Sequence, residues 1–192
     1  SGYAGNYFFI AQWFPKIGVY EFDAADSTKT GQWNCHQYHS ASEFYADFGV
    51  YEVDITVPNL YVVGATGKRT EKKDNTDGTK TYTYRANDVI DFAWTASQKY
   101  KTVNENFNDI AIQLLIQPEH IHQASRYIES VKHALRYFEK HVGKYPYPTL
   151  TLVDPPINGM ATGGMEYPTL ITLNTLWNMP EGFKLPELVT IH

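Results

Sequence analysis

The chain has 192 residues, enough for one large domain or two small ones and well above the size at which a fold depends on disulfides. Hydrophobic residues make up 43% of the chain and aromatic residues 15%, which argues against a disordered segment and predicts a globular protein with a buried core. The formal net charge of −5 argues against a nucleic-acid partner. Every apolar run is interrupted before the ~18 residues needed for a membrane span. The single cysteine, Cys35, excludes an internal disulfide.

The chain up to Gln117 has the two-residue period that is typical of β-strands. Apolar and polar residues alternate over 51–57, which predicts a half-buried strand. Segments 61–66 and 79–85 are predicted to pair as a hairpin around an exposed, mobile tip at 68–80. Further runs rich in β-branched and aromatic residues cover 89–96 and 110–116. We therefore expect residues 1–117 to form a mainly β, N-terminal domain.

Beyond Pro118 the period changes to that of an α-helix. Apolar residues recur at intervals of three and four from Ile121 to Val142, with charged residues on the opposite face. Pro118 suits a first helical turn and Gly143 suits a C-terminal cap, so we predict one long amphipathic helix that begins near Glu119. This change of period places a domain boundary at 117/118, with a second domain over 118–192.

The last part of the chain combines two strand-like runs, at 149–153 and 166–173, with a glycine-rich loop between them. Pro186 and Glu187 suit the first turn of a second helix, and the sequence stops two turns later at His192. Because a helix that starts there leaves its apolar face unfinished, we expect the sequence to be cut from a longer protein. The first residue, Ser1, leaves room for a removed signal segment, which slightly favours an extracytoplasmic setting.

Two groups of residues suggest metal binding, and a structural role is the commoner explanation for each. Cys35, His36 and His39 can all ligate metals, but a closed zinc site needs four ligands and the next histidine is far along the chain. His120 and His122 are two positions apart, so on a helix they point away from each other and cannot chelate together. We expect both to lie at a solvated helix start.

Aromatic residues gather early in the sequence and could form a platform for a peptide or a carbohydrate, although strands favour such residues for packing alone. The residues concerned are Tyr7, Trp13, Tyr20, Trp33 and Tyr38. No Walker loop, dinucleotide fingerprint or serine-hydrolase elbow occurs in the sequence. A non-catalytic, β-rich module that binds peptide or carbohydrate is therefore the alternative to an enzyme.

The sequence Gly163-Gly164-Met165-Glu166-Tyr167 resembles the Gly-x-Met-Glu-Asn exopeptidase signature of the gluzincin zinc aminopeptidases, the family of the alanyl and leucyl aminopeptidases and leukotriene hydrolase. Three further stretches agree with that family in order and spacing. Residues 11–15 (Ala-Gln-Trp-Phe-Pro) are similar to a Thr-Gln-x-x-Pro loop, and residues 144–148 (Lys-Tyr-Pro-Tyr-Pro) are similar to the segment that leads into the signature. Residues 185–192 (Leu-Pro-Glu-Leu-Val-Thr-Ile-His) resemble the approach to His-Glu-x-x-His.

The resemblance implies a saddle-like domain of antiparallel sheets, followed by the first part of an α+β, thermolysin-like catalytic domain. It implies that His192 is the first zinc ligand and that the catalytic Glu and the remaining ligands follow it in the parent protein. The expected cofactor is zinc in the full-length protein, with none held tightly by this fragment, which is expected to be inactive alone. The expected partners are a peptide with a free N-terminus and the rest of the catalytic domain, with neither nucleic acid nor a membrane span.

The resemblance also implies the residues that bind substrate. Glu166 would pair with the α-ammonium of the peptide, and Gly163 and Gly164 would let the peptide backbone approach closely. Gln12 would line the first specificity pocket. Tyr167 stands where the family has Asn, and Phe14 stands where the family at times has a carboxylate two residues after the loop Gln, so the amine anchor rests on Glu166 alone. The full implied set is Gln12, Gly163, Gly164, Met165 and Glu166.

Overall fold

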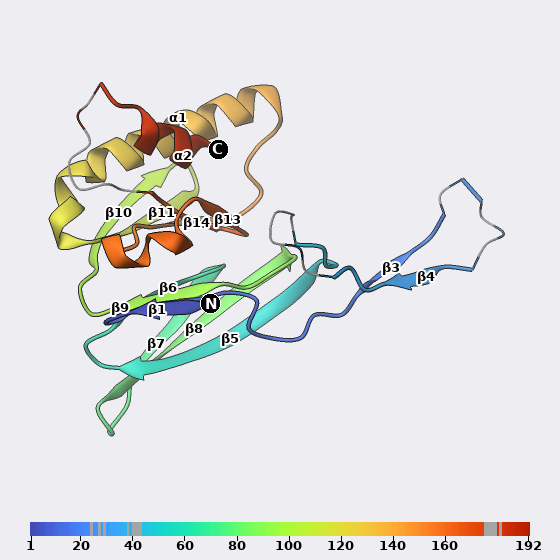
Figure 1. Ribbon diagram of the computed structural model, residues 1–192, viewed down its shortest axis with the longest axis horizontal. Helices are drawn as coiled ribbons and strands as arrows, with labels where there is room; N and C mark the ends of the chain where they lie inside the picture. Colours follow the sequence, from blue (N-terminus) through green and yellow to red (C-terminus); the bar gives the residue numbers. More distant parts are fainter. Residues whose placement is uncertain are drawn as a thin grey trace.

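The structure is a computed structural model, and it describes residues 1–23, 25–26, 28, 30–37, 39, 44–174, 180 and 182–192. These residues form mainly antiparallel β-sheets with one long helix near the C-terminal part of the chain (Figure 1), which confirms the predicted mainly β class. None of the helices in the described part of the chain combines the length and the hydropathy that a bilayer span requires.

Three of the sheets are wholly antiparallel and come from the first hundred residues. A four-stranded sheet has the order β1 (Gly2–Ala4), β2 (Tyr7–Ile10), β9 (Trp94–Ser97) and β6 (Val62–Ala65). A three-stranded sheet has the order β5 (Gly49–Pro58), β8 (Thr79–Val89) and β7 (Lys68–Asp74). Strands β3 (Val19–Glu21) and β4 (Gln32–Asn34) pair in a hairpin that projects from the rest of the molecule (Figure 1).

The fourth sheet is mixed and unites strands from both sides of position 117/118. Its order is β10 (Lys101–Phe107), β11 (Ile110–Ile116), β12 (Thr149–Val153), β14 (Leu170–Thr172) and β13 (Met165–Tyr167). Strand β12 runs parallel to β11 and to β14, and a parallel pair needs a crossover connection. The 3₁₀-helix η1 (Pro118–Gln123) and helix α1 (Ala124–His141) supply it between β11 and β12. The domain division at 117/118 stays a prediction.

Two short helical segments complete the second half of the chain. The 3₁₀-helix η2 (Ile157–Thr162) lies between β12 and β13, and helix α2 (Leu185–Ile191) follows β14. Both α1 and α2 lie on the same side of the mixed sheet, and the four-stranded sheet lies on its other side (Figure 1).

Alternation along β11 places the core on both faces of the mixed sheet. Leu114 packs in a cluster with Tyr127 and Val131 of α1, whereas the next residue, Leu115, packs in a second cluster with Phe9 of β2. A third cluster lies between the four-stranded and three-stranded sheets. The fold is therefore layered as helices, mixed sheet, four-stranded sheet and three-stranded sheet.

Two predictions about the β region are wrong. Segment 68–80 is not a mobile tip, because Lys68–Asp74 forms β7 and pairs with β8 over most of its length. Segments 61–66 and 79–85 do not pair with each other, since β6 pairs with β9 and β8 pairs with β5 and β7. Every residue of β7 is exposed and polar, and its sequence therefore has no alternation between apolar and polar residues that would predict a strand. Charged residues are usual on such an edge strand.

The predicted long helix is confirmed, with a different beginning. Residues 118–123 form the 3₁₀-helix η1, and the α-helix starts at Ala124. Ile128, Val131 and Leu135 in the middle of the apolar stripe are buried, whereas Val142 at its end is 81% exposed. The expectation that His120 is solvated is wrong, because its side chain is fully buried.

Candidate functional site

The motif that resembles the exopeptidase signature begins at two glycines with different structural requirements. A Cβ atom at Gly163 would lie 2.5 Å from the carbonyl oxygen of Leu173, so the chain itself leaves no room for a side chain there. Gly164 has a φ of +70°, a conformation that L-residues with side chains rarely adopt. Both glycines therefore serve the turn that leads into β13, and whether a peptide also approaches them stays a prediction.

Strand β13 places Glu166 at the margin of the mixed sheet. The backbone N–H of Met165 donates to Oγ1 of Thr172 at 2.9 Å, and Glu166 lies opposite Ile171 of β14. Strand β14 is the one partner that β13 has among the described residues, because β13 is last in the strand order. An unpaired strand edge can accept an extended peptide as an additional strand.

Helix α2 carries His192 to the same region from a different part of the chain. A cavity of about 600 Å³ lies between α1, α2 and the β13–β14 hairpin, and both Glu166 and His192 line it. Gly164 and Met165 line it beside Glu166. The remaining walls are mostly apolar, with Val131, Leu135, Phe138, Ile171, Leu188 and Val189 among them. The volume is in the range of small-molecule sites.

Gln12 lies outside this cavity. It follows β2 with a φ of +52°, and its side-chain amide donates to Oδ2 of the buried Asp91. The ammonium of Lys16 lies 3.0 Å from the same oxygen, so Asp91 contacts two residues of the segment that follows β2. Gln12 lines a separate, smaller pocket of about 270 Å³, together with Phe44, His36 and other residues.

Tyr167 follows Glu166 on β13 and packs against two aromatic rings. Its ring packs 6.2 Å from that of Phe44, which lines the Gln12 pocket, and 5.5 Å from that of Phe9, measured between ring centroids. Burial, followed by the negative charges of Asp91 and Glu166, raises the pKa of Tyr167 to about 12. Tyr167 is therefore neutral at physiological pH, and its contact with Phe44 links β13 to a residue that lines the Gln12 pocket.

A second contact fixes the approach to the motif from the opposite side of the sheet. The hydroxyl groups of Tyr7 in β2 and Thr162 at the end of η2 are 2.7 Å apart, and burial raises the pKa of Tyr7. A Cβ atom at Gly159 would lie 2.9 Å from the Tyr7 ring, so η2 packs directly on that ring. The four-stranded sheet thus fixes η2, the segment that directly precedes Gly163.

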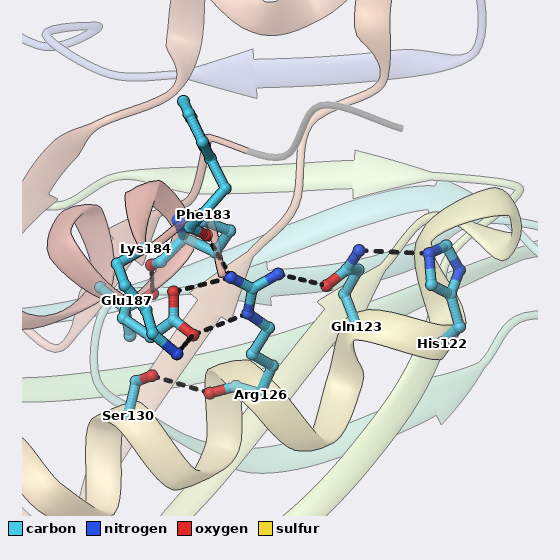
Figure 2. Close-up of polar contacts among 9 residues, drawn as sticks. His122, Gln123, Arg126, Ser130, Phe183, Lys184 and Glu187 are labelled. Atoms are coloured by element: carbon cyan, nitrogen blue, oxygen red, sulfur yellow. Dashed lines mark hydrogen bonds and ion pairs between the residues drawn. The ribbon is translucent and has the colours of Figure 1, made fainter. Parts of the chain in front are cut away.

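Two side-chain pairs in the second half of the chain were not predicted from the sequence. Arg126 of α1 binds Glu187 of α2 across 61 positions (Figure 2). The buried side chains of His120 and Asp154 meet at 2.8 Å between Nδ1 and Oδ2, 34 positions apart. Residues so far apart in sequence carry no local signal, and a single sequence does not reveal such pairs.

The resemblance implies zinc, and zinc needs three or four protein ligands. No three His, Cys, Asp or Glu side chains in the described ranges lie close enough together to hold a metal ion. His36 and His39 approach to 5.3 Å between ring centroids, but they do not belong to a group of three. The described residues therefore do not form a zinc site by themselves, and His192 stays a predicted ligand.

Of the early aromatic residues, Tyr7 is buried in the core, whereas Trp13, Tyr20 and Trp33 are at least 37% exposed. Tyr38 lies outside the described residues. The rings of Tyr20 and Trp33 meet edge to face at 5.0 Å on the β3–β4 hairpin, and Phe22 packs 5.1 Å from Tyr20 on the same hairpin. Tyr20 and Trp33 therefore belong to an exposed aromatic cluster, and binding of a peptide or a carbohydrate to it stays a prediction.

No protein-family model matches the chain, and no curated protein matches it either. The chemistry of the residues around the 600 Å³ cavity therefore carries the functional argument.

Proposed function

We propose that this chain is the substrate-anchoring part of a zinc-dependent aminopeptidase of the gluzincin type. In this proposal residues 1–117 are a saddle-like N-terminal domain and residues 118–192 begin a thermolysin-like catalytic domain. One observation carries it: Glu166 on the edge strand β13 and His192 at the end of α2 line the same cavity, although they come from separate elements. Zinc belongs to the full-length protein, with His192 as its first ligand.

The chemistry of substrate anchoring follows from the groups around the cavity. The carboxylate of Glu166 pairs with the α-ammonium of a peptide, since a charge-assisted hydrogen bond distinguishes a free from a blocked N-terminus. The open edge of β13 binds the peptide backbone, and the apolar walls of the cavity favour an aliphatic or aromatic first side chain. Together these contacts fix the first peptide bond relative to the end of α2.

The proposal is tested with leucine 4-nitroanilide and its N-acetylated analogue, using the parent protein that contains this chain. We expect zinc-dependent hydrolysis that a chelator abolishes. In Glu166→Gln, the KM for the free amine should rise about tenfold or more, while the blocked substrate is affected little. Glu71→Gln, on the exposed strand β7, is the matched control. Chelator-insensitive turnover, or an equal effect of Glu166→Gln on both substrates, would contradict the proposal.

A non-catalytic, β-rich binding module is the second candidate, because the projecting β3–β4 hairpin carries an exposed aromatic cluster. Phe22 is 72% exposed and Trp33 is 62% exposed. Such rings can stack on peptides or sugars. If this function is correct, Trp33→Ala should abolish binding to a peptide or oligosaccharide array while Glu166→Gln leaves it unchanged. The opposite result would favour the aminopeptidase.

A further inference from the structure

Helix α2 is too short to hold its own position. It has seven residues, and isolated helices of that length are not stable in water. Its apolar residues Leu188, Val189 and Ile191 line the 600 Å³ cavity, and Leu188 is 65% exposed. Apolar packing beneath α2 is therefore incomplete at the end that carries His192, and other contacts must fix the helix.

Those contacts are concentrated on Arg126, in the first turn of α1. Its Nε donates to Oε1 of Glu187 at 2.7 Å, and its Nη2 donates to Oε2 at 3.0 Å, so the two groups meet as a bidentate pair (Figure 2). The same Nη2 donates to the carbonyl oxygen of Phe183, just before α2 begins. Arg126 therefore binds both the first turn of α2 and the chain that enters it.

The guanidinium group is itself held in place. Its Nη1 donates to Oε1 of Gln123 at 3.1 Å (Figure 2). The side chains of Arg126 and Glu187 are only 12% and 21% exposed, so solvent screens their attraction less than it would on an open surface. A planar guanidinium fixes both the distance and the angle of a carboxylate, whereas a lysine would fix neither.

We infer that Arg126 and Glu187 are positioning residues: they dock the start of α2 on α1 and thereby set where His192 lies relative to Glu166 across the cavity. The consequence for catalysis rests on the proposed function, but the docking itself does not. A shift of the first turn of α2 is transmitted along two helical turns to the imidazole, while Glu166 stays fixed on β13.

The docking is tested by amide hydrogen exchange in the chain itself. Two amides report on α2: Leu188 N–H, bonded to Lys184 at 2.9 Å, and His192 N–H, bonded to Leu188 at 3.0 Å. In Arg126→Met and in Glu187→Gln we expect exchange at both amides to accelerate about tenfold or more, with central α1 amides unchanged. Amide exchange in the double variant should be only slightly faster than in either single variant, because both substitutions remove the same interaction.

Lys132→Met is the matched control, since Lys132 is also on α1 but pairs with Glu105 and Glu129, away from α2. Arg126→Lys keeps the positive charge but loses the bidentate geometry of the guanidinium. It should therefore restore only part of the protection of the two amides against exchange. The inference is overturned if exchange at Leu188 and His192 matches that of the control. It is equally overturned if exchange accelerates to the same extent throughout α1, which would mean a general loss of stability.

An activity readout separates this inference from the proposed function. In an active zinc aminopeptidase containing this chain, Arg126→Met should lower kcat at least tenfold with a smaller change in KM, because the end of α2 moves and Glu166 does not. A parallel rise in KM without loss of kcat would contradict positioning. If the wild-type protein has no activity, the proposed function fails, and the exchange measurement still decides the role of the pair.

Discussion

Gly163 and Gly164 precede Glu166, and replacing either one with alanine is costly for a different physical reason. A Cβ atom at Gly163 would collide with the carbonyl oxygen of Leu173, while at Gly164 the positive φ is the obstacle. We predict that Gly163→Ala lowers the free energy of unfolding by about 1–3 kcal/mol, because the backbone must shift. Gly164→Ala should cost about 1–2 kcal/mol. Urea denaturation measures both.

Gly2→Ala is the control for these glycines, because a Cβ atom there meets nothing within 4 Å. It should change the unfolding free energy by less than about 0.5 kcal/mol. If Gly163→Ala proved as mild as Gly2→Ala, the turn before β13 would have to be looser than the structure describes.

Asp154 is the buried carboxylate that connects the end of β12 to η1. Its Oδ2 accepts hydrogen bonds from the Gln117 backbone at 2.9 Å and from Nδ1 of His120 at 2.8 Å. Asp154→Ala leaves both donors buried without a partner, so we predict a loss of about 3 kcal/mol in the free energy of unfolding. Asp54→Ala, which removes an exposed hydrogen bond to Thr83, should cost less than about 1 kcal/mol in the same urea titration. Equal losses would contradict a structural role for the buried pair.

Part of the candidate site could be proposed from consecutive residues in the sequence. The motif around Glu166 was visible because its residues are consecutive, and the structure brings Glu166 and His192 to one cavity. The burial of His120 was not predictable, since its partner Asp154 lies just after β12, 34 positions away. The side-chain amide of Gln12 binds Asp91, and nothing in the sequence links two residues that are 79 positions apart. The substrate-binding role of Gln12 stays a prediction.

Strands and helices were predictable where one face is buried and the other is exposed. The alternation over 51–57 gave strand β5, and the apolar stripe gave α1. Strand β7 was missed because all its side chains are exposed and its stability comes from backbone pairing with β8. The sequence analysis did not predict that β11 and β12 pair in parallel, although the order of strand, long helix and strand is typical of such a crossover.

The docking of α2 should depend on pH through Glu187. The hydrogen bond from Arg126 holds the pKa of Glu187 below its ordinary value of 4.5, and Lys184 adds to the effect. A carboxylate with a lowered pKa in the folded state contributes stability above its unfolded pKa and loses it as the pH falls through the folded value. We predict that the stability difference between wild type and Glu187→Gln is constant at pH values well above 4.5, the ordinary pKa of the group, and shrinks as the pH falls through the lowered pKa of the folded state.

Urea titrations at several pH values measure this difference. Glu139→Gln removes a carboxylate from the exposed surface of α1, so its difference from wild type should stay small at every pH. A difference for Glu187→Gln that grew as the pH fell would show that the carboxylate is not stabilised by Arg126.

The two halves of the chain are joined by backbone and side-chain contacts across the layers. The Gly67 N–H donates to Oγ1 of Thr169 at 2.6 Å, and Thr149 Oγ1 donates to the Gly67 carbonyl at 3.1 Å. Close approach is required here as well, since a Cβ atom at Gly64 would lie 2.4 Å from Leu115. These contacts fix the mixed sheet, which contains β13, against the N-terminal sheets.

The period change at Pro118 marks the start of the helical segment, but the mixed sheet crosses that point. Strands β10 and β11 supply two of its strands, and Ile112 and Leu114 pack in one core cluster with Tyr127 of α1. We predict that a shortened chain of residues 118–192 does not fold, because α1 loses the strand on which it packs. A chain of residues 99–192 should retain helical circular dichroism and slow amide exchange in α1, although its Leu115 face becomes exposed. If 118–192 alone unfolded cooperatively, with α1 protected as in the intact chain, then position 117/118 would be a domain boundary despite the shared sheet.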